Sequence, residues 1–140
     1  MKISARNVLA GKIRMVTKGA VNAEVTLEME GRETVVAVIT NSSADSLGLE
    51  SGKAAYAVIK ASEVMIGVGV DASHISARNV LHGEVSRVEE GAVNNEVEVQ
   101  LAGGTTVVAS ITKASVHSLE LRPGTKVSAI VKASNVLIGV

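Results

Sequence analysis

The chain has 140 residues, 14 acidic and 14 basic side chains, one tyrosine without any phenylalanine or tryptophan, and no cysteine. Zero net charge and a single tyrosine disfavour a nucleic-acid surface, which needs basic patches or stacking aromatics, and the lack of cysteine excludes disulfides and thiolate chemistry. The N-terminus lacks the apolar core of a signal peptide, and no segment approaches a membrane-spanning length. We therefore expect a cytoplasmic protein with neither nucleic acid nor membrane as a partner.

The sequence repeats itself with a shift of 72 residues. Of the 68 positions that pair residues 1–68 with 73–140, 35 are identical, without a gap. A fixed internal period indicates how many folding units a chain contains, so we expect two domains, 1–68 and 73–140, with a linker at 69–72. Units this small are marginally stable alone, and the linker spans at most roughly 14 Å. The two domains must therefore lie side by side.

The first copy is predicted to contain five strands, in line with the 24 valines of the chain. Val8–Val16 is the first strand, and residues 24–30 form a second with clean apolar–polar alternation. Gly31-Arg32 is a plausible hairpin turn into residues 34–40, whose continuous apolar run fits a strand covered on both faces. The remaining strands are predicted at 53–60 and 64–68.

One short helix is predicted between the third and fourth strands, at Ser42–Leu47. Serine or asparagine caps its start and Gly48 ends it. The second copy repeats the pattern, with its helix at Ala114–Leu119 followed by a Pro123-Gly124 turn. Five short strands with one helical turn after the third indicate an all-β protein of two OB-like, five-stranded Greek-key barrels.

Most polar residues that both copies keep are hydrogen-bond donors. The only kept acid is Glu24, with Glu96 as its equivalent, and it fits an exposed strand position or a structural ion pair. Donors with few acceptors suit a fully deprotonated anion. The kept polar residues of the first copy, each with an equivalent 72 residues later, include Ser4, Arg6, Asn7, Asn22, Thr40, Ser43, Ser46, Lys60 and Ser62.

The positions of these residues also favour an anion, although each has a structural interpretation. Ser43 lies at a predicted helix start, where free N–H groups favour negative charge, and residues 60–62 follow a strand, where backbone amides form a nest. Alternatively, Thr40 and Ser43 terminate a strand and cap a helix. Asn22 is then a turn residue, and Lys60 is a solvated surface lysine.

Nothing in the sequence indicates catalysis. His74, His82 and His117 are not kept between the copies, and neither a nucleophile–base pair nor a phosphate-binding glycine motif is present. We therefore expect no enzyme, no bare-cation site and no organic cofactor. Three kept glycine pairs are predicted to mark bends or turns, namely Gly11/Gly83, Gly52/Gly124 and Gly67/Gly139.

Taken in order, several motifs resemble the Mop domain of molybdate-binding proteins, a domain of the TOBE type. The resemblance covers nearly the whole chain twice, and two tandem units with nothing else are similar to the molbindin family. The motifs are Ser4-Ala5-Arg6-Asn7, 19–25, Ile39-Thr40, Ser46-Leu47 and 60–64 in the first copy, and 76–79, 91–97, 111–112, 118–119 and 132–136 in the second.

The resemblance implies cytoplasmic binding, storage and homeostasis of molybdate, or of its mimic tungstate, between the domains and subunits of a homotrimer. The implied molybdate ligands of the first copy are Ser4, Arg6, Lys60, Ala61 and Ser62, with Thr40 and Ser43 from a neighbouring domain. Those of the second copy are Ser76, Arg78, Lys132, Ala133 and Ser134, with Thr112 and Ser115. A second type of anion site near the symmetry axis is implied at Ala20, Val21 and Asn22 and at Ala92, Val93 and Asn94.

The chemistry of molybdate agrees with a site made of donors. Molybdate is a dianion without a proton at neutral pH, whereas phosphate largely carries a proton and needs an acceptor. Sulfate is a smaller bare dianion, so its rejection must rest on pocket size. One departure concerns the pocket wall, because many Mop units carry an aromatic residue shortly after Lys-Ala, where Ser62-Glu63 and Ser134-Asn135 stand here.

Two other functions remain open from the sequence. One is a regulatory or interaction module that senses the anion and acts through a partner protein. The other is an OB-type nucleic-acid binder, which the zero net charge and the single tyrosine disfavour.

Overall fold

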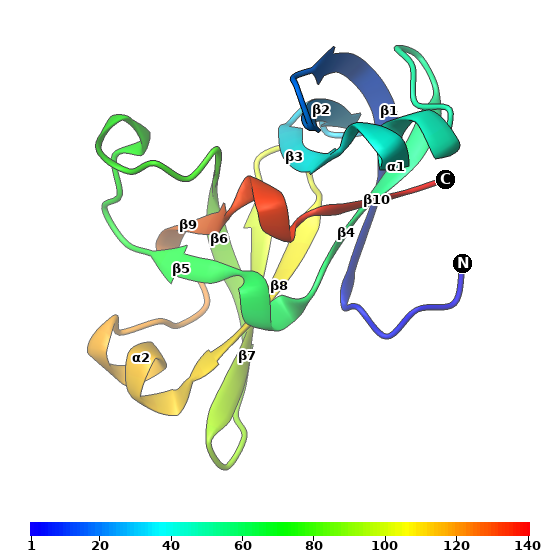
Figure 1. Cartoon of the computed structure of the whole chain (residues 1–140). Helices are drawn as coiled ribbons and strands as arrows, with labels where there is room; N and C mark the ends of the chain where they lie inside the picture. The colour runs from blue at the N-terminus through cyan, green and yellow to red at the C-terminus, as the bar shows by residue number, and fades with distance from the viewer.

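The computed structural model describes all residues, 1–140, and consists mainly of two five-stranded antiparallel sheets (Figure 1). This confirms the predicted all-β class. The elements of the first copy are β1 (Asn7–Lys18), β2 (Asn22–Met29), β3 (Thr34–Thr40), α1 (Asn41–Ser46), β4 (Ala54–Ile59), η1 (Ala61–Glu63) and β5 (Met65–Gly67). After η2 (Ala72–His74), those of the second are β6 (Asn79–Glu89), β7 (Asn94–Leu101), β8 (Thr106–Thr112), α2 (Lys113–Ser118), β9 (Lys126–Val131), η3 (Ala133–Asn135) and β10 (Leu137–Gly139).

The two copies exchange their last strands. The strand orders are β10-β4-β1-β2-β3 and β5-β9-β6-β7-β8, so each sheet is completed by a strand of the other copy. In Figure 1 the red β10 lies beside β4, and the green β5 lies beside β9. The expectation that each copy keeps its own fifth strand is therefore wrong. Met65-Ile66-Gly67 and Leu137-Ile138-Gly139 are nearly the same tripeptide, so the local sequence fits the edge of either sheet.

Each helix starts one residue earlier than predicted because a threonine caps it. The Thr40 hydroxyl accepts the N–H of Ser43 at 3.0 Å, and Thr112 accepts that of Ser115 at 3.1 Å. Gly48 follows α1 with φ +59°, as a helix-ending glycine does. The equivalent residue after α2 is Glu120, which has φ +53° in spite of its Cβ.

The third strand of each copy is an edge strand, and the other copy covers it. η3 packs against β3 and η1 packs against β8, which explains the apolar run of the predicted strand. The Asn7 side chain accepts the N–H of Val108 at 2.7 Å and donates to its carbonyl at 2.8 Å. Asn79 bonds Val36 in the same way, at 2.7 and 2.8 Å. Each amide thus occupies backbone groups that an edge strand otherwise leaves open.

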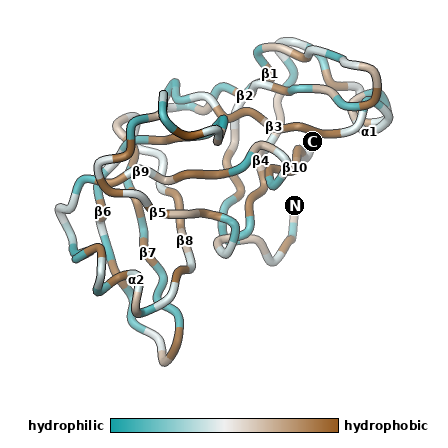
Figure 2. Tube along the Cα trace, turned by 60° about the vertical axis from the view of Figure 1, so that its left-hand side comes forward, coloured by the Kyte–Doolittle hydropathy of each residue, from teal (hydrophilic) through white to brown (hydrophobic).

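The aliphatic core is continuous across both copies. Figure 2 shows apolar segments running along the strands of both sheets, and the core cluster combines residues such as Leu27 and Val99 from the two halves. The two hairpin tips also meet, since a Cβ added to Gly31 would lie 2.7 Å from the carbonyl oxygen of Gly103. The two copies therefore pack as neighbours, as the short linker predicted. None of the helices has the length and apolar character that crossing a membrane requires.

Candidate functional site

The predicted ligands of the first copy gather at one end of β1 and β4. Asn7 pairs with Ile59, so Ser4 and Arg6, just before β1, lie at the same sheet end as the segment 60–62 just after β4. We call Ser4, Arg6 and Lys60–Ser62 the first wall. Because η1 packs against β8, this wall faces the edge strand of the second sheet.

The second copy forms the equivalent arrangement on the other sheet. Asn79 pairs with Val131, which brings Ser76 and Arg78 to the same end as Lys132–Ser134. We call these five residues the second wall. η3 packs against β3, and the Asn135 side chain of η3 donates to Glu63 of η1 at 3.0 Å. The two walls therefore lie on opposite sheets and are connected through their 3-10 turns.

The lysines of the walls are free of protein partners. Lys60 and Lys132 are exposed, and neither takes part in a side-chain hydrogen bond or an ion pair. The alanines that follow them are buried, at 7% exposure for Ala61 and 5% for Ala133, so only their backbone groups are available to a ligand. Each wall thus offers a free cation beside a short turn with exposed serine hydroxyls.

The arginines of the walls are already paired with carboxylates. The Arg6 Nη1 donates to Glu96 at 2.7 and 2.5 Å, and the Arg78 Nη1 donates to Glu24. The prediction that Glu24 and Glu96 serve as ion-pair partners is confirmed, and both pairs join the two copies. A glutamate carboxylate, which is a hydrogen-bond acceptor, therefore lies against each wall. The sequence predicted a site made almost entirely of donors.

The predicted hydroxyl ligands lie at the starts of the two helices and form no hydrogen bond with either wall. The Thr40 hydroxyl donates to the Ser43 hydroxyl at 2.9 Å, and the Thr112 and Ser115 hydroxyls are 2.8 Å apart. The capping interpretation is confirmed for Thr40 and Thr112, whereas Ser43 and Ser115 supply the backbone N–H groups that these threonines cap. Thr112 lies four residues, about 13 Å of strand, beyond the Val108 that Asn7 contacts.

The two predicted turn sites lie beside these helix caps. The N–H of Gly19 donates to the Asn22 carbonyl at 2.8 Å, and the N–H of Asn41, the first residue of α1, donates to the Val21 carbonyl at 2.8 Å. The same contact joins Lys113 of α2 to Val93, at 2.9 Å. The middle valines are 70% and 73% exposed, which is unusual for valine and leaves both turns open to solvent.

Asn7 and Asn79, which the sequence grouped with the anion-binding donors, have a structural role. They are 1% and 2% exposed, and their amides bond the backbone of the opposite copy. A buried amide whose hydrogen-bonding groups are already engaged is not available to an incoming anion. Each asparagine thus ties the strand end next to its wall to the edge strand of the other sheet.

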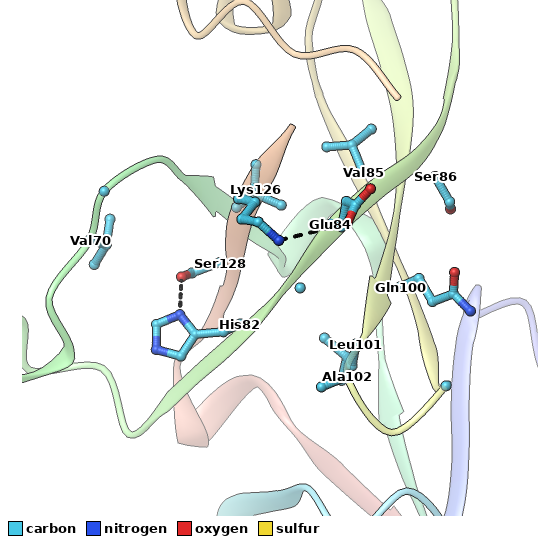
Figure 3. A pocket seen from close by; sticks show the side chains of 14 residues that line it. Val70, His82, Glu84, Val85, Ser86, Gln100, Leu101, Ala102, Lys126 and Ser128 are labelled. Atoms are coloured by element: carbon cyan, nitrogen blue, oxygen red, sulfur yellow. Dashed lines mark hydrogen bonds and ion pairs between the residues drawn. The ribbon is translucent and has the colours of Figure 1, made fainter. Parts of the chain in front are cut away.

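A depression of the surface lies away from both walls. It measures about 620 Å³ and is lined mainly by residues of β6, β7 and β9, together with Val70 of the linker (Figure 3). The His82 Nδ1 lies 2.8 Å from the Ser128 hydroxyl, and Lys126 lies 3.9 Å from Glu84. The sequence comparison of the copies missed this groove because none of these four residues is kept in the first copy. No group of three or more His, Cys, Asp or Glu side chains is placed to hold a metal ion.

Asp71 is a linker carboxylate held by hydrogen bonds from Ser73. The pKa of Asp71 is below its ordinary value because the Ser73 hydroxyl and the Ser73 backbone N–H both donate to its carboxylate. This carboxylate caps η2 at the start of the second copy. It belongs to neither wall.

Comparison with known proteins identifies the domain type. The TOBE domain matches residues 3–66 and 75–138. The chain is 42% identical over 138 residues to the molybdenum-pterin-binding protein MopA of Rhodobacter capsulatus, covering 99% of this chain and 52% of MopA. It is 39% identical over 140 residues to the molybdenum transport protein ModE of Herbaspirillum seropedicae, covering all of this chain and 52% of ModE.

The chain thus spans about half the length of these two curated relatives. A solved structure matches over its full length, namely the cytoplasmic molybdate-binding protein ModG in a form with molybdate bound. Its TM-score is 0.94 and its sequence identity 48%, with 100% of this chain and 99% of ModG covered. The two matched ranges correspond to the two copies of the repeat, and each range contains the residues of one wall. The chain therefore belongs to the TOBE-domain family, as a tandem Mop-domain protein of the molbindin type.

Proposed function

We propose that this chain binds molybdate, with tungstate as a close mimic, at sites that include the two walls. The observation that carries the proposal is the free lysine of each wall, which stands beside an arginine and exposed serine hydroxyls. Charge-assisted hydrogen bonds from such groups are the strongest that a protein offers an oxyanion. The likeness to ModG, which was solved with molybdate bound, supports the same ligand.

We further propose that the complete sites form between chains of a homotrimer. Thr40, Ser43 and their second-copy equivalents lie apart from the walls of the same chain, and the turns at 20–22 and 92–94 project into solvent. A neighbouring chain would bring these hydroxyls and turns against the walls. Ligand binding would then stabilise the assembly by mass action, which suits a cytoplasmic protein that stores molybdate and releases it.

Calorimetric titration of the purified protein with sodium molybdate, sulfate and phosphate tests the ligand. We expect molybdate to bind, and equal weak heats from all three anions would refute the proposal. The double variant Lys60→Ala and Lys132→Ala should weaken molybdate binding by roughly tenfold or more, because it removes the free cation of each wall. The matched control, Lys12→Ala and Lys126→Ala, removes the same charge from the sheets outside the walls and should bind as the parent does.

A second candidate is an anion-sensing module that acts through a partner protein. The observation that favours it is the match to about half of ModE proteins, one of which, from Yersinia pestis, is described as a transcriptional regulator. Affinity capture from lysate with and without molybdate separates the two candidates. A stoichiometric partner that changes with molybdate supports sensing, whereas storage predicts none.

A further inference from the structure

The two glutamates that pair with the wall arginines are not among the proposed ligands of the anion. Glu24 and Glu96 are the only acidic residues that both copies keep. Each lies near the start of a strand, β2 or β7, and reaches across to the arginine of the opposite copy. The pairing occurs twice between equivalent residues, although about half of the positions differ between the two copies.

We propose that Glu24 and Glu96 compete with an incoming oxyanion for the guanidinium groups of Arg78 and Arg6, and pair with these groups until the anion replaces them. This inference rests on the proposed function, because it takes the arginines as anion ligands. In the protein without a bound anion, the glutamate carboxylate accepts hydrogen bonds from the arginine guanidinium. When a tetrahedral dianion arrives, the arginine exchanges one acceptor for another, and the glutamate turns to solvent.

The geometry of the pairs permits such an exchange. Both arginines donate through Nη1 alone, which leaves the donors on Nε and Nη2 free to meet an anion before the carboxylate leaves. The side chains are half-exposed, at 49% for Arg6 and 32% for Glu96. A half-exposed pair contributes little to stability because water replaces either partner at small cost. The exchange is therefore energetically accessible.

The carboxylate also opposes the bound anion. A glutamate that remains within a few ångströms of a dianion repels it. Each glutamate thus sets an upper limit on the affinity of its wall for the anion. A protein that stores an anion reversibly needs such a limit, since release requires a competitor for the same donors.

The test is the sign of the affinity change in the double variant Glu24→Gln and Glu96→Gln, titrated with sodium molybdate as the full chain. We expect binding to tighten by roughly threefold to tenfold, because the competing acceptor and its charge are removed. A purely structural ion pair predicts the opposite sign, since its loss would disorder the arginine. The single variants Glu24→Gln and Glu96→Gln each leave one pair intact and should tighten only part of the sites.

The matched control is the double variant Glu28→Gln and Glu98→Gln. These glutamates lie in the same strands and pair with arginines outside the walls, Arg14 at 3.6 Å and Arg87 at 4.0 Å. This control variant should leave the affinity for molybdate unchanged if the tightening depends on the wall arginines and not on net charge. Unchanged or weaker binding by the wall variants, or equal tightening by the control, overturns this inference alone. Absence of molybdate binding by the parent protein overturns the proposed function and this inference with it.

Discussion

Replacing either buried asparagine, Asn7 or Asn79, by alanine should lower the free energy of unfolding, and we expect the larger loss for Asn7. In Asn7→Ala, the N–H and the carbonyl of Val108 lose partners at 2.7 and 2.8 Å. Val108 is only 8% exposed, so water does not replace these bonds. An unsatisfied buried backbone group costs about 1–3 kcal/mol, so the loss of two predicts a decrease of about 2–6 kcal/mol in the free energy of unfolding.

The equivalent change, Asn79→Ala, frees the backbone of Val36, which is half-buried. Water can bond these groups, so we expect a smaller loss of about 1 kcal/mol. Urea unfolding followed by far-UV circular dichroism measures both, at one protein concentration because association alters apparent stability. Asn22→Ala, at an exposed side chain without a hydrogen bond, is the control. Equal losses for the two buried amides, or a larger loss for Asn79→Ala, would refute the reasoning.

Three further predictions concern backbone geometry and the linker. Gly31→Ala should lower stability, because its Cβ would lie 2.7 Å from the Gly103 carbonyl oxygen and force the hairpin tips apart; thermal unfolding measures the loss. Glu120→Gly should raise the free energy of unfolding by about 0.5–1 kcal/mol, since φ +53° strains a residue with a Cβ, and no gain in urea unfolding would contradict this. The Asp71 carboxyl should have a pKa below 3.8 when titrated by NMR, because Ser73 donates hydrogen bonds to it. Its contribution to stability should be present above pH 3.8 and should disappear as the pH falls through the lower pKa of the folded state. A midpoint at or above 3.8 would show that this cap does not persist in solution.

Local patterns in the sequence predicted most of the strands, because each strand carries its own alternation or apolar run. Residues 34–40 were predicted with the bounds that the structure has. The exchange of the fifth strands was not predictable, since Met65-Ile66-Gly67 pairs with β9 in the same antiparallel way as Leu137-Ile138-Gly139 pairs with β4. Which edge such a tripeptide joins depends on the packing of the turn before it, and that is a tertiary property.

The candidate site shows the same division. The kept residues Arg6 and Lys60 could be grouped from the sequence, and the pairing of β1 with β4 places them together. Their surroundings could not be inferred, because the partner of Arg6 is Glu96, 90 residues away along the chain. The repeat did single out Glu96 as a kept acid, and that is the signal that pointed to the pair. The groove of His82 and Ser128 gave no such signal, since only one copy has it.

The exchanged strands have a consequence for how the protein depends on dilution. A single copy of this repeat would have to complete its sheet with a strand from another molecule, and the two would separate as their concentration fell. In the tandem chain the donor of that strand is tethered, so it is always present at a high effective concentration. Duplication has thus turned a bimolecular equilibrium into an intramolecular one. The pair of walls should consequently persist at protein concentrations too low for two single copies to associate.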